Sequence, residues 1–449
     1  MNENIFSEIN QNEIMCEKTS LYKRNVSVWI AVLCVILAIV VTFMTTFVIL
    51  NDNYRASINN IKKEYNDELS SYKNAVGKIS SNLEGIEDLF KEISVLFEMN
   101  YIYDVNYDEL IKNIIKDYAA ETGDRYAYYY TAEEWANEID VGKGNSCGIG
   151  IYIAARFQDN LQNIDGGLFV THVMEDGPAD LAGLKKGDHI VAVNGTVLDG
   201  MLYDDALDLT AGEKGTTVIL TIVRDDAEIE IPVVRDQYKI QTVLYDIIEE
   251  KGKKIGLIHI TQFVEVTVQQ FKDTVKTAIK DGCDGIIFDV RGNPGGYLDA
   301  IIEILDYLLP SGPIVSVSDN NGIITKYDSD ASGIDNIEVV VLADGSTASA
   351  AELFASALKD YKYADIIGEK TYGKGCGQTI YPLSNGGYLK LTSFLYNPPF
   401  SENYDGIGVI PDIEVSLDEE YRNQNVLLLE RDQDKQLEAA IQNILNKLK

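Results

Sequence analysis

A serine within a run of small residues has the setting of an enzymatic nucleophile. Residues 339–342 form a β-branched apolar run, which predicts a buried strand. Apolar residues then recur at helical spacing over 350–358, so Ser349 is predicted to lie in a strand-to-helix turn. Free N–H groups at the start of a helix favour a developing negative charge, which suits acyl transfer. The competing interpretation is that Ser349 only caps the helix.

A lysine that could take the proton of this serine follows later in the chain. Lys374 lies between Gly373 and Gly375, and Gln378 follows it at the fourth position. Flanking glycines let the backbone approach other groups closely, which suits a side chain aimed into a site. The amine must be uncharged to act as a base, and lowering its pKa from about 10.4 to near 7 costs roughly 4 to 5 kcal/mol, which burial must supply. Gln378 is predicted to orient the amine by a hydrogen bond.

Two other kinds of site are less well supported by the same region. Residues 368–374 match the first seven positions of the phosphate-binding G-x-x-x-x-G-K loop, but Gly375 stands where a magnesium-holding Ser or Thr is required. None of the three histidines is near the serine turn in sequence, and His259 lies in an apolar stretch typical of a core strand. A Ser-His-Asp triad assembled from distant residues stays open, although the lysine is better placed.

The serine turn and the lysine loop together resemble the C-terminal processing peptidases, also called tail-specific proteases. The turn over 347–352, TASAAE, is similar to the family's T-A-S-A-S-E, with Ala351 in place of the second serine. Lys374 and Gln378 fall at the family's spacing from the turn. The resemblance implies Ser349 as nucleophile, Lys374 as base and a crotonase/ClpP-like α/β protease core.

The resemblance also implies an oxyanion hole. Its donors would be the backbone N–H groups of Ala350, next to the nucleophile, and of Gly295 in the sequence RGNPGG. This glycine-rich stretch follows the predicted strand that ends at Asp289, and open α/β sheets build their sites at such strand ends. A plain strand-to-helix connection is the alternative for these glycines.

A second domain is predicted over 141–236. The stretch from Gly177, GPADLAGLKKGDHIVAVNG, closely resembles a PDZ domain in the permuted form that these proteases carry. By this resemblance the N–H groups of Gly148, Ile149, Gly150 and Ile151 would hold the C-terminal carboxylate of a peptide. The strand that starts at Ile151 would accept the peptide as an added strand. An ordinary hairpin turn is the alternative for the glycines.

The first hundred residues predict a membrane anchor and a stalk. Residues 29–50 are apolar and uncharged and would span about 33 Å as a helix, which fits a hydrocarbon core of roughly 30 Å. A cleaved signal peptide and a buried soluble helix are the alternatives. A heptad pattern follows over 51–97 and predicts a coiled-coil stalk that pairs two chains, with a helix that packs on its own domain as the alternative for its last part. The short tail, 1–28, is expected in the cytoplasm, and the catalytic part is expected outside the cell membrane. The basic residues on the two sides of the span are nearly equal in number, so they barely decide this orientation.

Composition excludes several other classes of protein. The net charge of -33 argues against a nucleic-acid-binding protein. Five scattered cysteines do not form a disulfide framework, and no zinc-binding spacing occurs, so we expect no metal and no cofactor.

The sequence thus predicts an α+β multidomain chain: a transmembrane helix, a helical stalk, an N-terminal helical segment over 98–140, a permuted PDZ domain and a peptidase core over 237–449. The core ends in a helix polar enough for a surface or a dimer contact. The predicted function is a membrane-anchored serine endopeptidase that cleaves proteins near their C-termini. A catalytically silent PDZ scaffold and an acyl-transferring enzyme of crotonase type are the alternatives. Expected partners are proteins with free C-termini and a second copy of the chain, with a regulatory protein as a further partner.

Overall fold

The computed structural model describes residues 83–449 except 159–162, 331–332, 334–336 and 423, together with scattered positions between 62 and 80. The predicted cytoplasmic tail and membrane anchor, 1–28 and 29–50, lie outside these residues, as does much of the predicted stalk. Within the described residues, no helix combines the length and the apolar composition that a membrane crossing needs. The chain divides into two compact units, Met1–Asn106 and Tyr107–Lys449, and each is described by itself.

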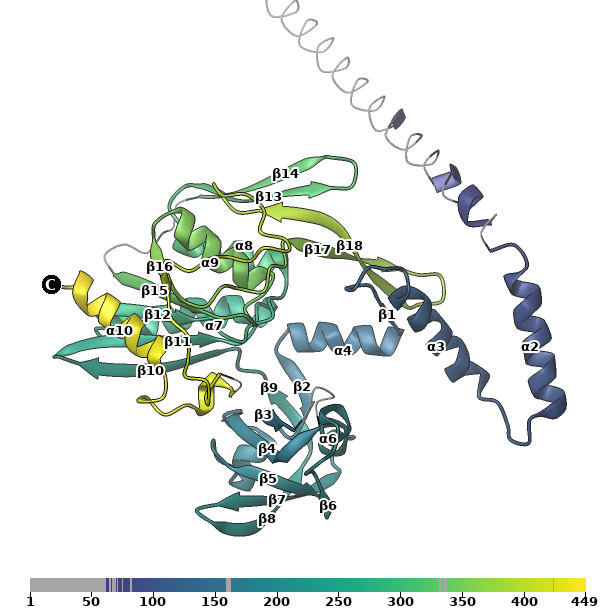
Figure 1. The fold of residues 1–449 in the computed structure, drawn as a ribbon, viewed down its shortest axis with the longest axis horizontal. Coiled ribbons are helices and arrows are strands. Elements are labelled where there is room, and N and C mark those ends of the chain that lie inside the picture. Colours follow the sequence, from purple (N-terminus) through teal and green to yellow (C-terminus); the bar gives the residue numbers. More distant parts are fainter. Residues whose placement is uncertain are drawn as a thin grey trace, which may run out of the picture. The chain divides into compact units, whose positions relative to one another are not determined.

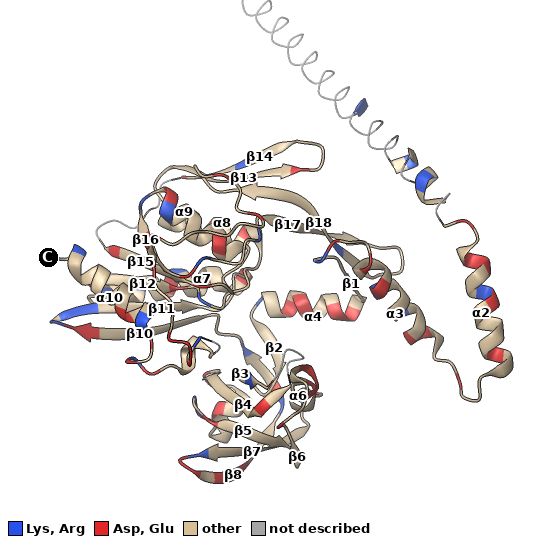
Figure 2. Ribbon diagram, in the orientation of Figure 1, with Lys and Arg blue, Asp and Glu red and all other residues tan. Residues whose placement is uncertain are grey.

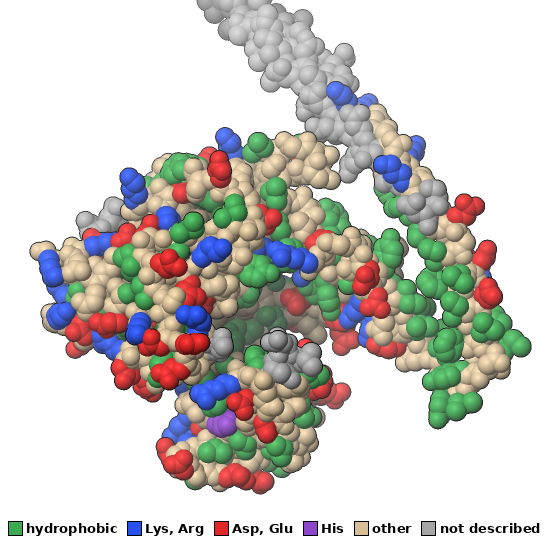
Figure 3. Space-filling view, in the orientation of Figure 1, with side chains coloured by type: hydrophobic (Ala, Val, Ile, Leu, Met, Phe, Trp, Pro, Cys, Tyr) green, Lys and Arg blue, Asp and Glu red, His purple; other side chains and the backbone are tan. Residues whose placement is uncertain are grey.

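The first unit contains helix α2 (Ile86–Asn100), which has no buried residue. Its apolar side chains are exposed, as Figure 3 shows along the helix; Leu89 is 53% and Phe90 48% exposed. The helical residues 76–80 are separated from α2 by a turn at Gly85, whose φ of 86° is left-handed. Where the predicted stalk is described, residues 76–80 and α2 are helical and a break lies between them at Gly85, which adopts this conformation without steric cost. The pairing of two chains by the stalk stays a prediction.

The second unit begins with the segment that precedes the PDZ domain. Its elements are α3 (Tyr107–Ala120), β1 (Tyr128–Tyr130) and α4 (Ala132–Gly142). Helix α4 begins at a capping box, in which Thr131 accepts from Glu134 N and the Glu134 carboxylate accepts from Thr131 N. Figure 2 shows the acidic positions of α4 in red on the ribbon. The sequence analysis predicted helix here, but it did not predict β1.

The next elements form the expected PDZ-like domain. The strands are β2 (Asn145–Gly148), β3 (Ile151–Phe157), β4 (Ile164–Val173), β5 (His189–Val193), β6 (Thr196–Val197), β7 (Thr217–Arg224), β8 (Ala227–Val234) and β9 (Asp236–Lys239). The helices are α5 (Pro178–Ala182) and α6 (Tyr203–Thr210). The main sheet has the order β3-β4-β5-β7-β8, so β3 is an edge strand, while β2 pairs with β9 in a separate ladder. An edge strand can accept a further strand.

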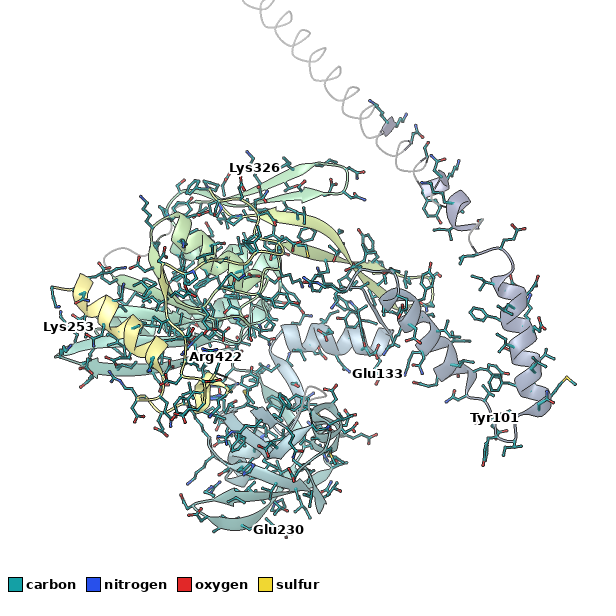
Figure 4. All side chains as sticks on the ribbon, in the orientation of Figure 1. Tyr101, Glu133, Glu230, Lys253, Lys326 and Arg422 are labelled. Carbon is teal, nitrogen blue, oxygen red and sulfur yellow. The ribbon has the colours of Figure 1, made fainter. Side chains whose placement is uncertain are left out.

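The peptidase core is built on a six-stranded sheet (Figure 1). Its order is β10 (Val243–Glu250), β11 (Lys253–Ile260), β12 (Gly285–Asp289), β15 (Glu338–Ala343), β16 (Ala364–Gly368) and β19 (Ile413–Glu414). All neighbours are parallel except β10 and β11. Lys253, labelled in Figure 4, marks the turn from β10 into β11. The apolar runs of the central strands are buried on both faces, as parallel sheets require.

Helices cover both faces of this sheet. On one face α7 (Glu265–Lys280), α8 (Leu298–Leu308) and α9 (Ala350–Asp360) share a core with Phe288 and Val341. On the other face α10 (Lys435–Lys447) packs Ile441 and Ile444 against Ile287 and Val340. The last helix is therefore a structural part of the core on one side, where Gln436 is also buried, and Glu438 is exposed on its other side. A short 3-10 helix, Val426–Leu428, precedes it.

A buried ionic cluster fastens α10 to the glycine-rich stretch that follows β12. The Arg291 guanidinium donates to both carboxylate oxygens of Asp289, to both of Asp434 and to Gln436. Asp434 also caps α10 by accepting from Leu437 N. Although burial alone would raise the pKa of Asp289, the charge and hydrogen bonds of Arg291 hold it well below its usual value.

A second sheet lies beside the core. It joins β1, β18 (Tyr388–Asn397), β13 (Gly312–Asp319) and β14 (Ile324–Ser329), with β17 (Cys376–Pro382) paired to β18. The turn at 383–387 closes β17 and β18 into the hairpin that its Ser-Asn-Gly-Gly sequence predicts. Strand β1 adds along β18, with Tyr128 opposite Lys390. The tyrosine cluster 126–130 thus brings the segment before the PDZ domain onto the hairpin that follows the predicted catalytic lysine.

Candidate active site

Ser349 occupies a strained turn between β15 and α9. Its φ of 57° and ψ of -121° lie outside the regions that residues with a Cβ normally adopt. Such a conformation costs about 1 to 3 kcal/mol and is typical of functional sites. The side chain makes no capping hydrogen bond to the helix. This argues against the interpretation that Ser349 serves only as a cap.

A buried carboxylate holds the serine turn and the lysine loop together. Glu352 is 0% exposed, and its Oε2 accepts from the N–H groups of Ser349 at 2.9 Å and Lys374 at 2.7 Å. Its Oε1 accepts from Thr371 Oγ1 at 2.5 Å and Gly373 N at 2.7 Å. Four donors thus converge on one side chain. Glu352 therefore couples the backbone position of Ser349 to that of Lys374.

Lys374 extends from this loop and bonds to Gln378. Its Nζ donates to Gln378 Oε1 at 2.9 Å and lies 4.1 Å from the centre of the Tyr126 ring. Burial lowers the pKa of Lys374 below its usual value, and the charges of Lys390 and Arg125 lower it further. The flanking glycines are needed, because a Cβ on Gly375 would lie 2.5 Å from Asn403 Oδ1.

The neighbouring strand pair aims Gln378. The ladder between β17 and β18 shifts register at Gly377, so that Gln378 lies opposite Thr392. A Cβ on Gly377 would lie 2.1 Å from the Phe394 ring, so this position admits only glycine without rearrangement. Gln378 Nε2 donates to Thr392 Oγ1 at 3.2 Å. Both ends of the amide therefore have partners.

The structure shows no direct hydrogen bond between the side chains of Ser349 and Lys374, both of which belong to the described residues. Tyr396 lies beside both of these residues: its hydroxyl donates to Lys374 O at 2.6 Å. Burial raises the pKa of Tyr396, although the adjacent Tyr404 and Ser349 side chains oppose this. Catalytic hydrogen bonds are often loose until a substrate binds.

The predicted oxyanion donors, Ala350 and Gly295, lie next to Ser349 but differ in their hydrogen bonds. A Cβ on Gly295 would lie 2.6 Å from Ser349 Cβ and 2.9 Å from Ala350 N, so its lack of a side chain permits this contact. Gly295 N donates to Asn293 Oδ1 at 2.8 Å. In the described part of the chain, the N–H groups of Ala350 and Gly296 have no hydrogen-bond acceptor. The N–H group of Gly296 is therefore free here, although it was not predicted from the sequence as a donor.

The described residues give less support to a histidine base or a metal site than to Lys374. His259 is buried, and its Nδ1 lies 3.5 Å from Asp289 Oδ2. No hydrogen bond joins it to Ser349 there. Among the residues that the structure describes, no cluster of three or more His, Cys, Asp or Glu side chains could hold a metal ion.

The predicted carboxylate-binding loop of the PDZ-like domain lies between β2 and β3. Ile149 O accepts from Ala179 N, and Gly150 O accepts from Met174 N. These bonds fix the carbonyl groups, whereas the N–H groups of Ile149 and Gly150 have no acceptor in the described part of the chain. Free N–H groups at the start of an edge strand suit a peptide carboxylate.

Comparisons with known proteins identify the families that match the two domains. The model of peptidase family S41 matches residues 254–415, and the PDZ domain model matches 138–223. A carboxy-terminal-processing protease of Bartonella bacilliformis is 32% identical over 373 residues, covering 81% of this chain and 80% of the relative. The chain belongs to peptidase family S41.

Other S41 relatives extend this comparison. A CtpA-like serine protease of Staphylococcus aureus is 31% identical over 351 residues, covering 77% of this chain and 67% of the relative. Among solved structures, an S41 protease of Bacteroides fragilis covers 70% of this chain and 88% of its own, with 19% identity and a TM-score of 0.52. The photosystem II D1 C-terminal processing protease has 27% identity and a TM-score of 0.45, covering 73% and 86%. This S41 peptidase is a serine-type carboxyl-terminal processing enzyme with a PDZ domain.

The S41 site also contains a residue whose role sequence reasoning did not assign. Glu352 was visible only as the last residue of the family-like turn. The spacing from Ser349 to Glu352 is that of a capping box, in which the third residue reaches back to the backbone of the first. That pattern could have indicated the bond to Ser349 N, but not the bonds to the lysine loop, which comes from elsewhere in the chain.

Proposed function

We propose that this chain is a membrane-anchored serine endopeptidase that trims proteins from their C-termini, with Ser349 as nucleophile, Lys374 as base and Gln378 as the residue that orients the base. The observation that carries this proposal is the shared carboxylate of Glu352, which binds the backbone of both Ser349 and Lys374. A strained serine and a partly desolvated lysine thus belong to one rigid arrangement.

The reaction proceeds through an acyl-enzyme. When substrate closes the site and removes water, neutral Lys374 takes the proton of Ser349 Oγ, which attacks the peptide carbonyl carbon. The N–H groups of Ala350 and of Gly295 or Gly296 stabilise the oxyanion; Gly295 can take this role if it releases Asn293. Lys374 then gives the proton to the leaving nitrogen as the C–N bond breaks. Water, deprotonated by Lys374, hydrolyses the ester and regenerates the serine.

Substrate selection is assigned to the PDZ-like domain. The carboxylate of a protein's C-terminus would be held by the N–H groups of the loop from Gly148 to Ile151, and the chain before it would add to the edge of β3. A silent scaffold would bind in the same way without cleavage. The strained turn and the partly buried Lys374 favour the enzyme, because a scaffold has no need to store strain at Ser349.

Ser349→Ala should abolish cleavage and leave binding of C-terminal peptides intact, because the PDZ-like loop lies elsewhere in the fold. The measurement is cleavage of a peptide with a free C-terminus, together with its binding by calorimetry. The C-terminally amidated copy should bind at least about 10-fold more weakly, since it lacks the charge that the loop N–H groups recognise. Normal cleavage by Ser349→Ala would show that another residue is the nucleophile, and equal binding of both peptides would remove the role of the loop.

The anchor assigned to residues 29–50 would place the catalytic part outside the cell membrane. The uncharged apolar stretch supports this proposal. After alkaline carbonate extraction of membranes, the full chain should stay in the pellet, and a chain lacking 1–50 should be released. Release of both would argue against an anchor. The exposed apolar face of α2 supports pairing of two such chains beside the membrane.

A further inference from the structure

The segment before the PDZ domain reaches the catalytic lysine through a chain of hydrogen bonds. Just ahead of β1, Asp124 Oδ2 accepts from Thr392 N at 2.7 Å, and Asp124 Oδ1 accepts from Thr392 Oγ1 at 3.0 Å. Thr392 Oγ1 accepts from Gln378 Nε2 at 3.2 Å. Gln378 Oε1 accepts from Lys374 Nζ at 2.9 Å. These hydrogen bonds thus connect Asp124, near the start of the second unit, to the proposed base, Lys374.

The chemistry of these groups allows only one direction of donation along this series of hydrogen bonds. An ionised carboxylate only accepts hydrogen bonds, so the single hydroxyl proton of Thr392 is committed to Asp124. The hydroxyl oxygen can then only accept from Gln378, which requires the NH2 end of the amide to face Thr392. Burial alone would raise the pKa of Asp124, but bonds from Thr392 and Tyr126 and the charge of Lys374 lower it, which keeps it ionised.

We propose that Asp124 and Thr392 are positioning residues for Gln378. They hold its amide so that the oxygen, and not the NH2 group, faces Lys374. A neutral lysine amine has two N–H bonds and one lone pair. With one N–H bound by Gln378 Oε1, the lone pair is left to take the serine proton. A reversed amide would donate to that lone pair and block it, so the orientation decides whether the amine can act as a base. This inference rests on the function proposed above for Ser349 and Lys374.

The same segment also covers the amine. Tyr126 N donates to Asp124 Oδ1 at 3.0 Å, and the Tyr126 ring lies over Lys374 Nζ. Its hydroxyl oxygen is buried and has no hydrogen-bond partner among the described residues. Burial raises the pKa of Tyr126 to about 12, so it stays neutral and adds no charge. One carboxylate therefore fixes both the ring above the amine and the hydroxyl that orients Gln378.

The decisive test compares two substitutions at Thr392 in the full-length, detergent-solubilised protein. Thr392→Val removes the hydroxyl but keeps the shape and the N–H bond that pins Asp124, so the fold should survive. We expect kcat to fall about 10-fold to 100-fold with KM about unchanged, the range found for partners that orient a functional group. Thr392→Ser restores the hydroxyl and should restore kcat. If Thr392→Val has the kcat of the original protein, the proposal is wrong.

Asp124→Asn gives a second test, in which the dependence of kcat on pH is measured. A merely structural role of Asp124 would shift this dependence in the opposite direction. The titratable and charged groups around Lys374 are Cys376 at the start of β17, Lys390 on β18, and Asp124, Arg125 and Tyr126 before β1. Asp124 favours the charged amine, so its neutralisation should shift the rise of kcat with pH to lower pH while the plateau falls. A loosened segment would expose the amine to water and shift the rise to higher pH. That shift would overturn the proposal.

The control for the loss of charge is Glu121→Gln, an exposed carboxylate of the same segment, which should leave kcat and its pH profile unchanged. Failure of this inference is distinct from failure of the proposed function. If Ser349→Ala is inactive and Thr392→Val is fully active, only the positioning role is lost. If Ser349→Ala cleaves normally, the assignment of the base falls with that of the nucleophile.

Discussion

Lys374→Arg should be inactive at every pH at which the original protein cleaves. Arginine keeps its proton because its pKa exceeds about 12, so it cannot accept the proton of Ser349. In the original protein burial lowers the pKa of Lys374 from 10.5, and the charges of Lys390 and Arg125 add to this effect. Because the neutral amine is the active form, the rate should rise with pH through that lowered pKa. The measurement is kcat/KM as a function of pH.

The size of the loss in kcat distinguishes a general base from a residue that only binds substrate. Removal of a general base costs about 100-fold to 10,000-fold in kcat, and loss of a residue that acts as one unit with the nucleophile costs up to about a million-fold. Lys370→Arg is the matched control, since Lys370 is exposed and precedes the loop. Retention of a tenth or more of the activity by Lys374→Arg would show that another group takes the proton.

Glu352→Gln should impair both stability and catalysis, although it changes one atom. The carboxylate accepts four hydrogen bonds, two on each oxygen. An amide keeps one accepting oxygen, and its NH2 group would face two donors. Each buried donor without an acceptor costs about 1 to 3 kcal/mol, so we expect a loss of roughly 2 to 6 kcal/mol in the free energy of unfolding. Denaturant titration measures this loss.

Catalysis should fall further than stability explains. If the substituted amide releases Ser349 N, the strained turn relaxes, and if it releases Lys374 N, the base moves away from the nucleophile. We expect kcat/KM to fall at least about 100-fold under conditions where the variant is still folded, because small displacements of reacting groups cost that much. Glu402→Gln, on an exposed loop, provides the control. A stable and active Glu352→Gln protein would exclude the coupling role.

The elements that surround the candidate site could be predicted from local patterns. The apolar run 339–342, the helix after it and the glycines around Lys374 are short-range signals, and each corresponds to an observed feature. The hairpin after Gln378 follows in the same way from its turn residues. These signals work because strand burial, helix periodicity and turn geometry depend on neighbours in the chain.

What could not be predicted depends on contacts between distant segments. The tyrosine-rich stretch 126–130 has no local pattern that indicates pairing with β18, because its partner lies far away in the sequence. The same holds for Glu352 and the lysine loop, and for Asp434 and Arg291. Nor did the polar character of the last helix reveal that its other face packs on the sheet. The engagement of Gly295 N by Asn293 is a further detail of this kind.

The pairing of β1 with β18 sets a limit on how far the enzyme can be shortened. A protein trimmed to the region matched by the two family models, from 138 to 415, would lack β1 as well as α10. The backbone of 388–390 would then become a bare sheet edge, and the apolar face of the core sheet would lose its cover. Uncovered edges recruit strands from other molecules, so such a fragment should aggregate. A shortened version suited to crystallisation therefore has to include both β1 and α10.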